Sequence, residues 1–401
     1  GKQMLVEAGE ENAGLVDIIG EELDNSYYAK ISNFPFKRRG WGKCRLTYSP
    51  LHGSGVAVIP KFMKQLGFTE LSVVSEQEKP DGMFPTVKSP NPEEASSFAL
   101  AITSATQSKS DMVFATDPDC DRMNFMVSEN NKWIAFTGHQ IAALLTDYTL
   151  KCYQESKMMP KNPLVIKTIV TSPLIQKIAQ HYGATCEETL TGFKWIAERI
   201  NQYEQSTNEE SPRFVCGGEE SFGFLADIDV RDKDGVQASL IAADLVSYYQ
   251  SIGKPLTKVL DEFFLKFGVF YESLHSMTLP GLSGQEKIKK LMKTLRSTPP
   301  KKLGPFTVES VCDYQYPHQE GPSPLVTQQL PSSDVLRFVL SNHDTVTIRP
   351  SGTEPKIKIY SSAMKSTAIT NPSELPTIKQ QVKNRLEVIQ KNIILLINSK
   401  I

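Results

Sequence analysis

Three aspartates at alternate positions, Asp117, Asp119 and Asp121, form the most informative segment of this 401-residue chain. The apolar runs on either side, 112–115 and 123–127, predict short buried strands, so the aspartates fall in a loop between strand ends. Oxygen ligands that are few in number and leave positions for water or phosphate favour Mg²⁺ over Zn²⁺ or a closed Ca²⁺ cage. The segment therefore predicts a magnesium site.

Two alternatives to a magnesium site have similar acidic segments, an EF-hand loop and a solvated acidic turn. An EF-hand loop needs glycine at its sixth position and glutamate at its twelfth, and this chain has Arg122 and Ser128 there, which excludes that class. A solvated acidic turn is the plainer alternative. It does not account for Arg122 directly after the third aspartate, where a guanidinium can hold an anionic ligand beside a metal.

A second candidate segment, residues 349–356, reads Arg-Pro-Ser-Gly-Thr-Glu-Pro-Lys and lies between two expected strands. It combines a fixed cation, two hydroxyl groups and a glycine that lets backbone N–H groups turn inward, which is the chemistry of a phosphate cradle. It is not a Walker A loop, which needs Gly-Lys-Ser/Thr at the start of a helix. On these residues alone, a simple glycine turn is an equal alternative.

Two further polar segments follow expected strands. The glycine-rich residues 216–223 carry Glu219, Glu220 and Ser221. Carboxylates accept hydrogen bonds from sugar hydroxyls, so this segment favours a neutral polyol, with an exposed acidic turn as the alternative. Thr191-Gly192 precedes an expected helix, whose first N–H groups are available to a ligand.

The elements that must position these segments alternate between strands and helices over most of the chain, which predicts βαβ units. Strands are expected at 43–48, 164–169, 185–190 and 214–216, and helices at 55–66, 173–182, 193–201, 236–250 and 255–267. The last third changes character, with proline-rich stretches around 299–300 and 317–331. There we expect strands at 335–340, 345–349 and 356–360, a turn at 342–344, and helices at 286–295 and 374–397.

The turn at 52–58 resembles the start of a dinucleotide-binding fingerprint. Val58 stands where the third glycine or alanine belongs, so no dinucleotide cofactor is expected.

Composition excludes several classes of protein. The net charge of −1, without a basic stripe, argues against a nucleic-acid partner. The six cysteines form no C-x-x-C pair, which favours a reducing compartment. No apolar run reaches about 18 residues, and the N-terminus lacks the features of a signal peptide. We therefore expect a soluble cytoplasmic protein with no membrane partner, folded as about two to four domains.

In this order, the segments resemble the α-D-phosphohexomutase family, the phosphoglucomutases and phosphomannomutases. Residues 84–87, 90–93 and 47–55 resemble its phosphoglucomutase-2-like branch. The resemblance implies two consecutive mixed α/β domains, 1–130 with the metal loop and 131–267 with the sugar loop. An α+β, TATA-binding-protein-like domain with the phosphate loop, 268–401, would follow them.

The resemblance also implies roles for individual residues. Mg²⁺ would be bound by Asp117, Asp119 and Asp121, and Lys233 would be an acid or base in proton transfer. Substrate contacts are implied for Arg122, Lys167, Thr191, Gly192, Glu219, Ser221, Arg349, Ser351, Gly352 and Thr353.

The implied activity is transfer of phosphate between the 1 and 6 positions of a hexose phosphate, through a hexose 1,6-bisphosphate. The family's chemistry needs a phosphoserine in a Thr-x-Ser-His-Asn segment, which these 401 residues do not contain. The chain is therefore expected to match the family's second to fourth domains and to be inactive alone. A non-catalytic sugar-phosphate-binding module, a phosphopentomutase and a glucose 1,6-bisphosphate synthase remain as alternatives.

Overall fold

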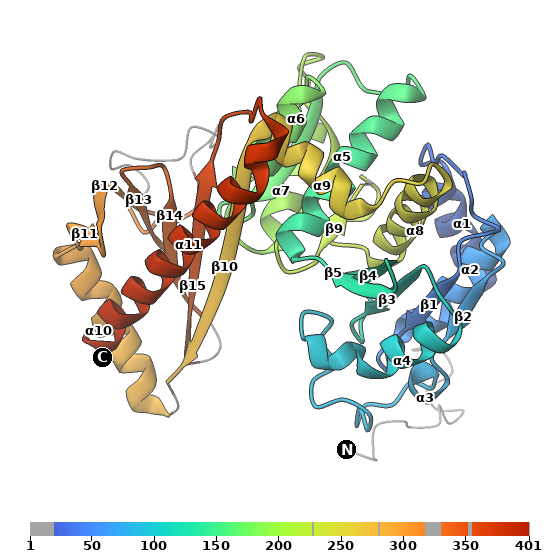
Figure 1. Ribbon diagram of the computed structural model, residues 1–401, viewed down its shortest axis with the longest axis horizontal. Helices are drawn as coiled ribbons and strands as arrows, with labels where there is room; N and C mark the ends of the chain where they lie inside the picture. Colours follow the sequence, from blue (N-terminus) through green and yellow to red (C-terminus); the bar gives the residue numbers. More distant parts are fainter. Residues whose placement is uncertain (1–19, 227, 280, 317–329, 352–354, 401) are drawn as a thin grey trace. The chain divides into compact units, whose positions relative to one another are not determined.

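The computed structural model describes residues 20–226, 228–279, 281–316, 330–351 and 355–400 (Figure 1). The chain forms two compact parts, one ending at Phe36 and the other beginning at Lys37, and each is described by itself. The described residues of the first part contain helix α1 (Glu21–Ser32), with acidic residues in its first turn and Lys30 in its last, as suits the helix dipole. Among the described residues, no helix is long and apolar enough to cross a membrane.

The second part begins with a five-stranded mixed sheet of order β2-β1-β3-β4-β5. Its strands are β1 (Leu46–Ser49), β2 (Leu71–Val73), β3 (Met112–Thr116), β4 (Met123–Glu129) and β5 (Lys132–Ala135). Strand β1 is parallel to β2 and β3, whereas β3, β4 and β5 are antiparallel neighbours. The two strands predicted around the aspartates are confirmed, and they form a hairpin whose connecting loop is 117–122.

Helical segments in the same region are η2 (Ser54–Ala57), α2 (Ile59–Leu66), α3 (Ser75–Glu78), η3 (Ala95–Phe98) and α4 (Ala99–Gln107). The single helix expected at 55–66 is split, and α2 begins at Ile59 because Pro60 fits only the first turn of a helix. Strand β1 begins later than expected because the N–H groups of Lys43 and Cys44 both turn back to the Gly40 carbonyl.

A second sheet has four strands in the order β7-β6-β8-β9. These strands are β6 (Pro163–Thr168), β7 (Thr185–Thr189), β8 (Arg213–Gly218) and β9 (Phe224–Leu225). Strand β6 is parallel to β7 and β8, which confirms the predicted βαβ units, and β8 and β9 form a hairpin around the predicted sugar loop.

The helices of this region are α5 (Gly138–Glu155), α6 (Leu174–His181), α7 (Phe193–Glu204), α8 (Gly235–Ser251) and α9 (Leu256–Phe267). Helix α5 packs against α8, α6 and β8 (Figure 1). No prediction covered it. Buried residues lie on all its sides, so its sequence lacks the one-sided apolar pattern of a surface helix.

The third sheet has six strands in the order β10-β15-β14-β13-β12-β11. They are β10 (Val269–Thr278), β11 (Lys302–Leu303), β12 (Phe306–Asp313), β13 (Leu336–Leu340), β14 (Thr345–Pro350) and β15 (Lys356–Lys365). All neighbours are antiparallel, and the predicted turn at 342–344 joins β13 and β14 with His343 at a φ of 65°.

Helices α10 (Leu282–Ser297), η4 (Pro372–Glu374) and α11 (Leu375–Asn398) complete this region. Helix α11, red in Figure 1, packs on β10 and β15. The arrangement is α+β, in contrast to the α/β arrangement of the first two sheets, as the sequence predicts. Of the proline-rich stretch at 317–331, only the last two residues lie within the described ranges.

Candidate functional site

The three aspartates converge in the β3–β4 loop, called here the metal loop (117–122). Asp117, Asp119 and Asp121 each offer a carboxylate oxygen within 4.8 Å of the others. The reversal between the last two aspartates is made by Cys120, which has a φ of 61° and donates its N–H to the Asp117 carbonyl oxygen at 3.0 Å. The hairpin thus brings together three carboxylates that are spaced two residues apart in the sequence.

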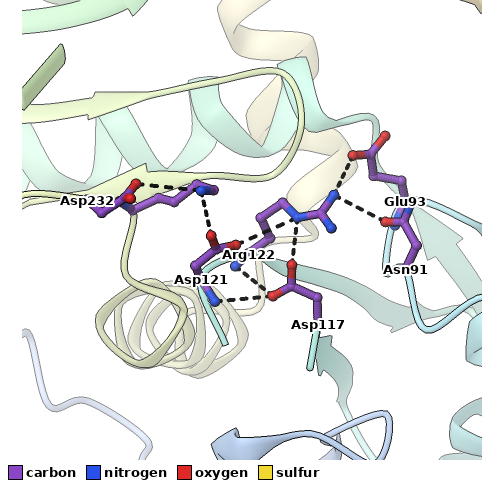
Figure 2. A network of polar contacts seen from close by, with 7 residues as sticks. Asn91, Glu93, Asp117, Asp121, Arg122 and Asp232 are labelled. Atoms are coloured by element: carbon purple, nitrogen blue, oxygen red, sulfur yellow. Dashed lines mark hydrogen bonds and ion pairs between the residues drawn. The ribbon is translucent and has the colours of Figure 1, made fainter. Parts of the chain in front are cut away.

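Asp117 is buried and accepts three hydrogen bonds (Figure 2). Its Oδ1 accepts from the backbone N–H groups of Asp121 at 3.1 Å and Arg122 at 3.0 Å, and its Oδ2 accepts from the Arg122 Nε at 2.7 Å. Burial raises the pKa of Asp117 to about 6; hydrogen bonds and charge from Arg122 oppose the shift, and the Asp121 charge adds to it. These donors orient the carboxylate and favour its charged form.

The donor set fits Mg²⁺. The ligands are all oxygens, and Mg²⁺ holds its ligands at about 2.0–2.1 Å, so two ligands of one ion lie up to about 4.2 Å apart. The oxygens of the metal loop are already within 4.8 Å of one another, and Asp119 is exposed. The exposed Asp119 side chain has room to adjust its position to a bound ion.

Two cations lie beside the carboxylates. The Arg122 Nη1 donates to Glu93 Oε1 at 2.7 Å and to Asn91 Oδ1 at 3.3 Å (Figure 2). The Lys233 Nζ lies 2.5 Å from Asp121 Oδ2. Burial lowers the pKa of Lys233, but the hydrogen bond and charge of Asp121 outweigh it and leave the pKa raised.

Close backbone contacts support the metal loop. A Cβ atom at Gly53 would lie 2.4 Å from the Pro118 Cα, and one at Gly235 would lie 2.5 Å from the Cys120 carbonyl oxygen. In both places a backbone N–H donates into the loop, from Ser54 to the Pro118 oxygen at 2.8 Å and from Gly235 to the Cys120 oxygen at 3.0 Å. The glycine turn at 52–55 therefore supports the metal loop.

The predicted sugar segment, residues 216–223, carries Glu219 in a largely buried position, and its residues 218–223 are called here the sugar loop. The Glu219 Oε1 accepts the Gly192 N–H at 2.8 Å, so the start of α7 and the sugar loop meet here. Burial raises the pKa of Glu219 to about 7, and the Glu220 charge adds to this; the Gly192 hydrogen bond and the charges of Lys233 and Arg349 oppose it. Gly192, Glu220 and Arg349, which belong to three different predicted segments, thus all affect the Glu219 carboxyl group.

The neighbouring Glu220 has different surroundings. Its Oε2 accepts from the Thr171 hydroxyl at 2.9 Å and the Thr168 hydroxyl at 3.2 Å, which ties the sugar loop to the end of β6. Ser221 lies half-buried in the turn that follows.

The metal loop and the sugar loop are joined through their backbones. Arg122 and Gly223 form an isolated antiparallel β-bridge, and the Met123 N–H donates to the Phe222 carbonyl oxygen at 3.2 Å. Phe222 has a φ of 68°, which turns this carbonyl within the tight loop. The two segments that the sequence assigns to metal and to sugar are therefore immediate neighbours.

Of the predicted phosphate loop, the structure describes its two ends. Arg349 lies opposite Lys358 on the neighbouring strand, and its side chain is hydrogen-bonded to Tyr360. The Ser351 N–H donates to the Lys356 carbonyl oxygen at 2.7 Å. The predicted contacts Gly352 and Thr353 lie outside the described residues.

Two other predicted residues lie around the sugar loop. Thr191 is half-buried directly before Gly192. Lys167 is buried, and its Nζ donates to Glu188 Oε1 at 2.6 Å and to the carbonyl oxygens of Thr171 at 3.0 Å and Thr168 at 3.3 Å. Its contact with substrate stays a prediction.

The residues that sequence reasoning left without a role are Asn91 and Glu93, which contact Arg122. The signal that pointed to them is the Pro-Asn-Pro-Glu string at 90–93.

Comparison with known proteins gives two family models that follow one another along the chain. "Phosphoglucomutase/phosphomannomutase, alpha/beta/alpha domain II" matches residues 25–130, and the corresponding domain III matches residues 137–267. A phosphoglucomutase of Staphylococcus aureus strain MRSA252 is 36% identical over 321 residues, which cover 79% of this chain and 56% of the relative. The chain thus spans about half the length of the curated relatives it matches.

Solved structures show the same fold. Parafusin, a phosphoglucomutase from Paramecium in its open form, aligns with a TM-score of 0.60 at 18% identity, over 92% of this chain and 62% of that one. A phosphoglucomutase/phosphomannomutase family protein from Burkholderia thailandensis aligns with a TM-score of 0.61 at 13% identity, over 94% of this chain and 64% of that one. The two family models and the curated relatives show that this chain belongs to the α-D-phosphohexomutase family of phosphoglucomutases and phosphomannomutases.

Proposed function

We propose that the protein acts in the reversible transfer of a phosphoryl group between the 1 and 6 positions of a hexose phosphate, through a hexose 1,6-bisphosphate. The observation that carries this proposal is the backbone bridge between Arg122 and Gly223, which places the metal loop beside the sugar loop. Curated relatives named phosphoglucomutase support the reaction class. Because the chain covers 56% of such a relative, the activity of the whole protein is part of the proposal.

At the phosphoryl end, Asp117, Asp119 and Asp121 would hold Mg²⁺, which when bound neutralises charge on a transferring phosphoryl group. Arg122 donates to an anionic oxygen there through charge-assisted hydrogen bonds. Lys233 carries a proton next to Asp121, which suits the acid of the proposed acid–base step; to act as the base it must first lose this proton.

At the sugar end, Glu219 and Ser221 bind hydroxyl groups. Arg349 binds the phosphate that is not being transferred. Further substrate contacts are proposed for Lys167, Thr191, Gly192, Ser351, Gly352 and Thr353. The bisphosphate must reverse its orientation between two half-reactions, so one loop recognises phosphate in either orientation and another recognises hydroxyls common to both.

We propose three domains with the boundaries expected from the sequence, 1–130, 131–267 and 268–401. We also propose that this 401-residue polypeptide binds sugar phosphates without turning them over, since it contains no Thr-x-Ser-His-Asn segment. Interconversion of glucose 1-phosphate and glucose 6-phosphate by the purified chain, with host enzyme excluded, would contradict this.

Two variants test the division between the recognition loops. We expect Arg349→Ala to weaken binding of glucose 1-phosphate, glucose 6-phosphate and inorganic phosphate alike, by about 1.5 to 3 kcal/mol for a bond to a charged group. Glu219→Ala should weaken both sugar phosphates and leave inorganic phosphate nearly unchanged, because inorganic phosphate has no sugar hydroxyls. Calorimetric titration of the wild type and both variants measures these affinities.

The controls are Arg213→Ala and Glu209→Ala, which remove the same charges from exposed positions. Unchanged sugar-phosphate affinity in Glu219→Ala, or unchanged phosphate affinity in Arg349→Ala, shows that the role assigned to that loop is wrong.

A further inference from the structure

The segment between α3 and η3, residues 79–94, is held beside the metal loop by side chains from elsewhere. The His52 Nε2 lies 2.8 Å from the Thr86 hydroxyl, and the Asn124 Nδ2 donates to the Pro92 carbonyl oxygen at 2.7 Å. Asn124 is on β4, directly after the metal loop. The position of this segment is therefore coupled to the strand that carries the loop.

At the end of this segment, two residues contact the guanidinium of Arg122 (Figure 2). Asn91 and Glu93 accept from Nη1, while Asp117 accepts from Nε on the other side. Among the residues that the structure describes, no acceptor is found for Nη2. The Arg122 side chain is 25% exposed, so an anion from solvent can reach it.

We propose that Glu93, assisted by Asn91, is a positioning residue for Arg122. A guanidinium is planar, so fixing Nε and Nη1 also fixes the direction in which Nη2 presents its two N–H groups. Arg122 is then oriented before phosphate arrives, which reduces the entropy lost on binding. The inference rests on the proposed function, because it assigns the phosphoryl group to the free side of Arg122.

The charge of Glu93 alone would act in the opposite direction. A carboxylate near the site repels an anionic ligand, so its removal would tighten phosphate binding if charge were its main effect. If Glu93 orients Arg122, its removal weakens phosphate binding instead. The sign of the change therefore separates the two roles.

The chain offers a matched set of variants. Glu93→Ala removes both charge and acceptor, Glu93→Gln keeps an acceptor oxygen, and Glu94→Ala removes the same charge one residue away. The Glu94 side chain is exposed, and no contact with Arg122 is found for it among the described residues. The parent protein and these three variants are all made in an Arg349→Ala background, so that inorganic phosphate reports on the metal loop.

In the presence of Mg²⁺, we expect Glu93→Ala to bind inorganic phosphate about three to ten times more weakly than Glu94→Ala, with most of the loss recovered in Glu93→Gln. NMR of ¹⁵N-arginine-labelled protein gives a second measurement that needs no ligand. The Arg122 Nη signals should be resolved by slow rotation in the parent protein, in Glu94→Ala and in Glu93→Gln, and averaged in Glu93→Ala.

Phosphate binding by Glu93→Ala that equals or exceeds that of Glu94→Ala overturns the inference, as do unchanged Arg122 signals in Glu93→Ala. Failure of the proposed function looks different. In that case Arg122→Ala itself leaves phosphate affinity unchanged, while the Glu93-dependent Arg122 signals persist in the parent protein.

Discussion

Two lysines that the sequence assigns to the same substrate have very different surroundings. The Lys167 side chain is 1% exposed and bonded to Glu188 and two carbonyl oxygens. The Lys233 side chain is 18% exposed and reaches Asp121, one of the three carboxylates of the metal loop. The first is an interior ion pair, and the second is a cation at the edge of a site.

The difference shows what burial adds to an ion pair. Removing one member of a buried pair leaves the other charged and without water, which is strongly destabilising. A partly exposed pair contributes little to stability, so its cation can move to a ligand at low cost. We therefore expect substitutions at Lys167 to affect mainly the fold and substitutions at Lys233 to affect mainly the site.

The largest effect is expected for Lys167→Met, which should lower the free energy of unfolding by about 3 kcal/mol. Glu188 keeps a buried charge, and its remaining cation, the Arg337 Nη1, lies 3.6 Å from the Glu188 Oε2, so the loss stays at the lower end of the range for a broken buried pair. Urea denaturation measures this. Lys161→Met is the matched control, since Lys161 and Glu210 form an exposed pair whose loss should cost less than about 1 kcal/mol. A stable Lys167→Met protein with weakened sugar-phosphate binding would instead show that Lys167 acts mainly through its proposed substrate contact and not through the fold.

A second test concerns a carboxyl group near Lys167. Burial raises the pKa of Glu272 from 4.5 to about 7, opposed by the Ser172 hydrogen bond and the Lys167 charge. The folded state then binds more protons than the unfolded state between these two values, so this group makes stability fall as pH rises through that window. Since one pKa unit is about 1.4 kcal/mol, the loss is on the order of 3 kcal/mol.

Glu272→Gln removes this titration. Between pH 4.5 and 7.5 the free energy of unfolding of the wild type should fall by more than that of the variant, as urea denaturation at several pH values can measure. If the two proteins lose stability in parallel, the fold does not raise the pKa of the Glu272 carboxyl group.

The smallest effect on stability is expected for Lys233→Met, below about 1 kcal/mol. Mg²⁺ should nevertheless bind roughly fivefold more tightly, because the ammonium no longer competes for the Asp121 oxygen, a change of about 1 kcal/mol at high dielectric. Calorimetry measures the affinity, with Lys132→Met on the exposed start of β5 as the control for lost charge. Weaker Mg²⁺ binding would mean that Lys233 supports the carboxylates instead of competing with them.

Sequence reasoning placed the aspartate loop correctly because local information determines it. Its carboxylates lie within five residues, between two apolar runs that form adjacent strands. The contact of Glu93 with Arg122 was out of reach because the two residues are 29 positions apart and only the folded segment 79–94 brings them together. The Pro-Asn-Pro-Glu string marked the place without indicating its partner.

The two lysines could not be told apart for a related reason. The chain around Lys167 reads as a buried strand, but nothing in it indicates that Glu188, on the neighbouring strand β7, supplies the counter-charge. Helix α5 was missed because it is buried on all sides. Its sequence has no polar face and therefore shows no helical periodicity of hydrophobic residues. In each case the deciding information is a contact between elements distant in sequence.

The bridge between Arg122 and Gly223 has a consequence for how this site can diverge. It is made by main-chain atoms, so exchanging the side chains of neighbouring residues removes none of its hydrogen bonds. Under the proposed function, other residues at Glu219 and Ser221 would suit other hydroxyl patterns without altering the distance between sugar ring and phosphoryl group. The backbone would then set a fixed length, and a change of sugar would need new side chains only.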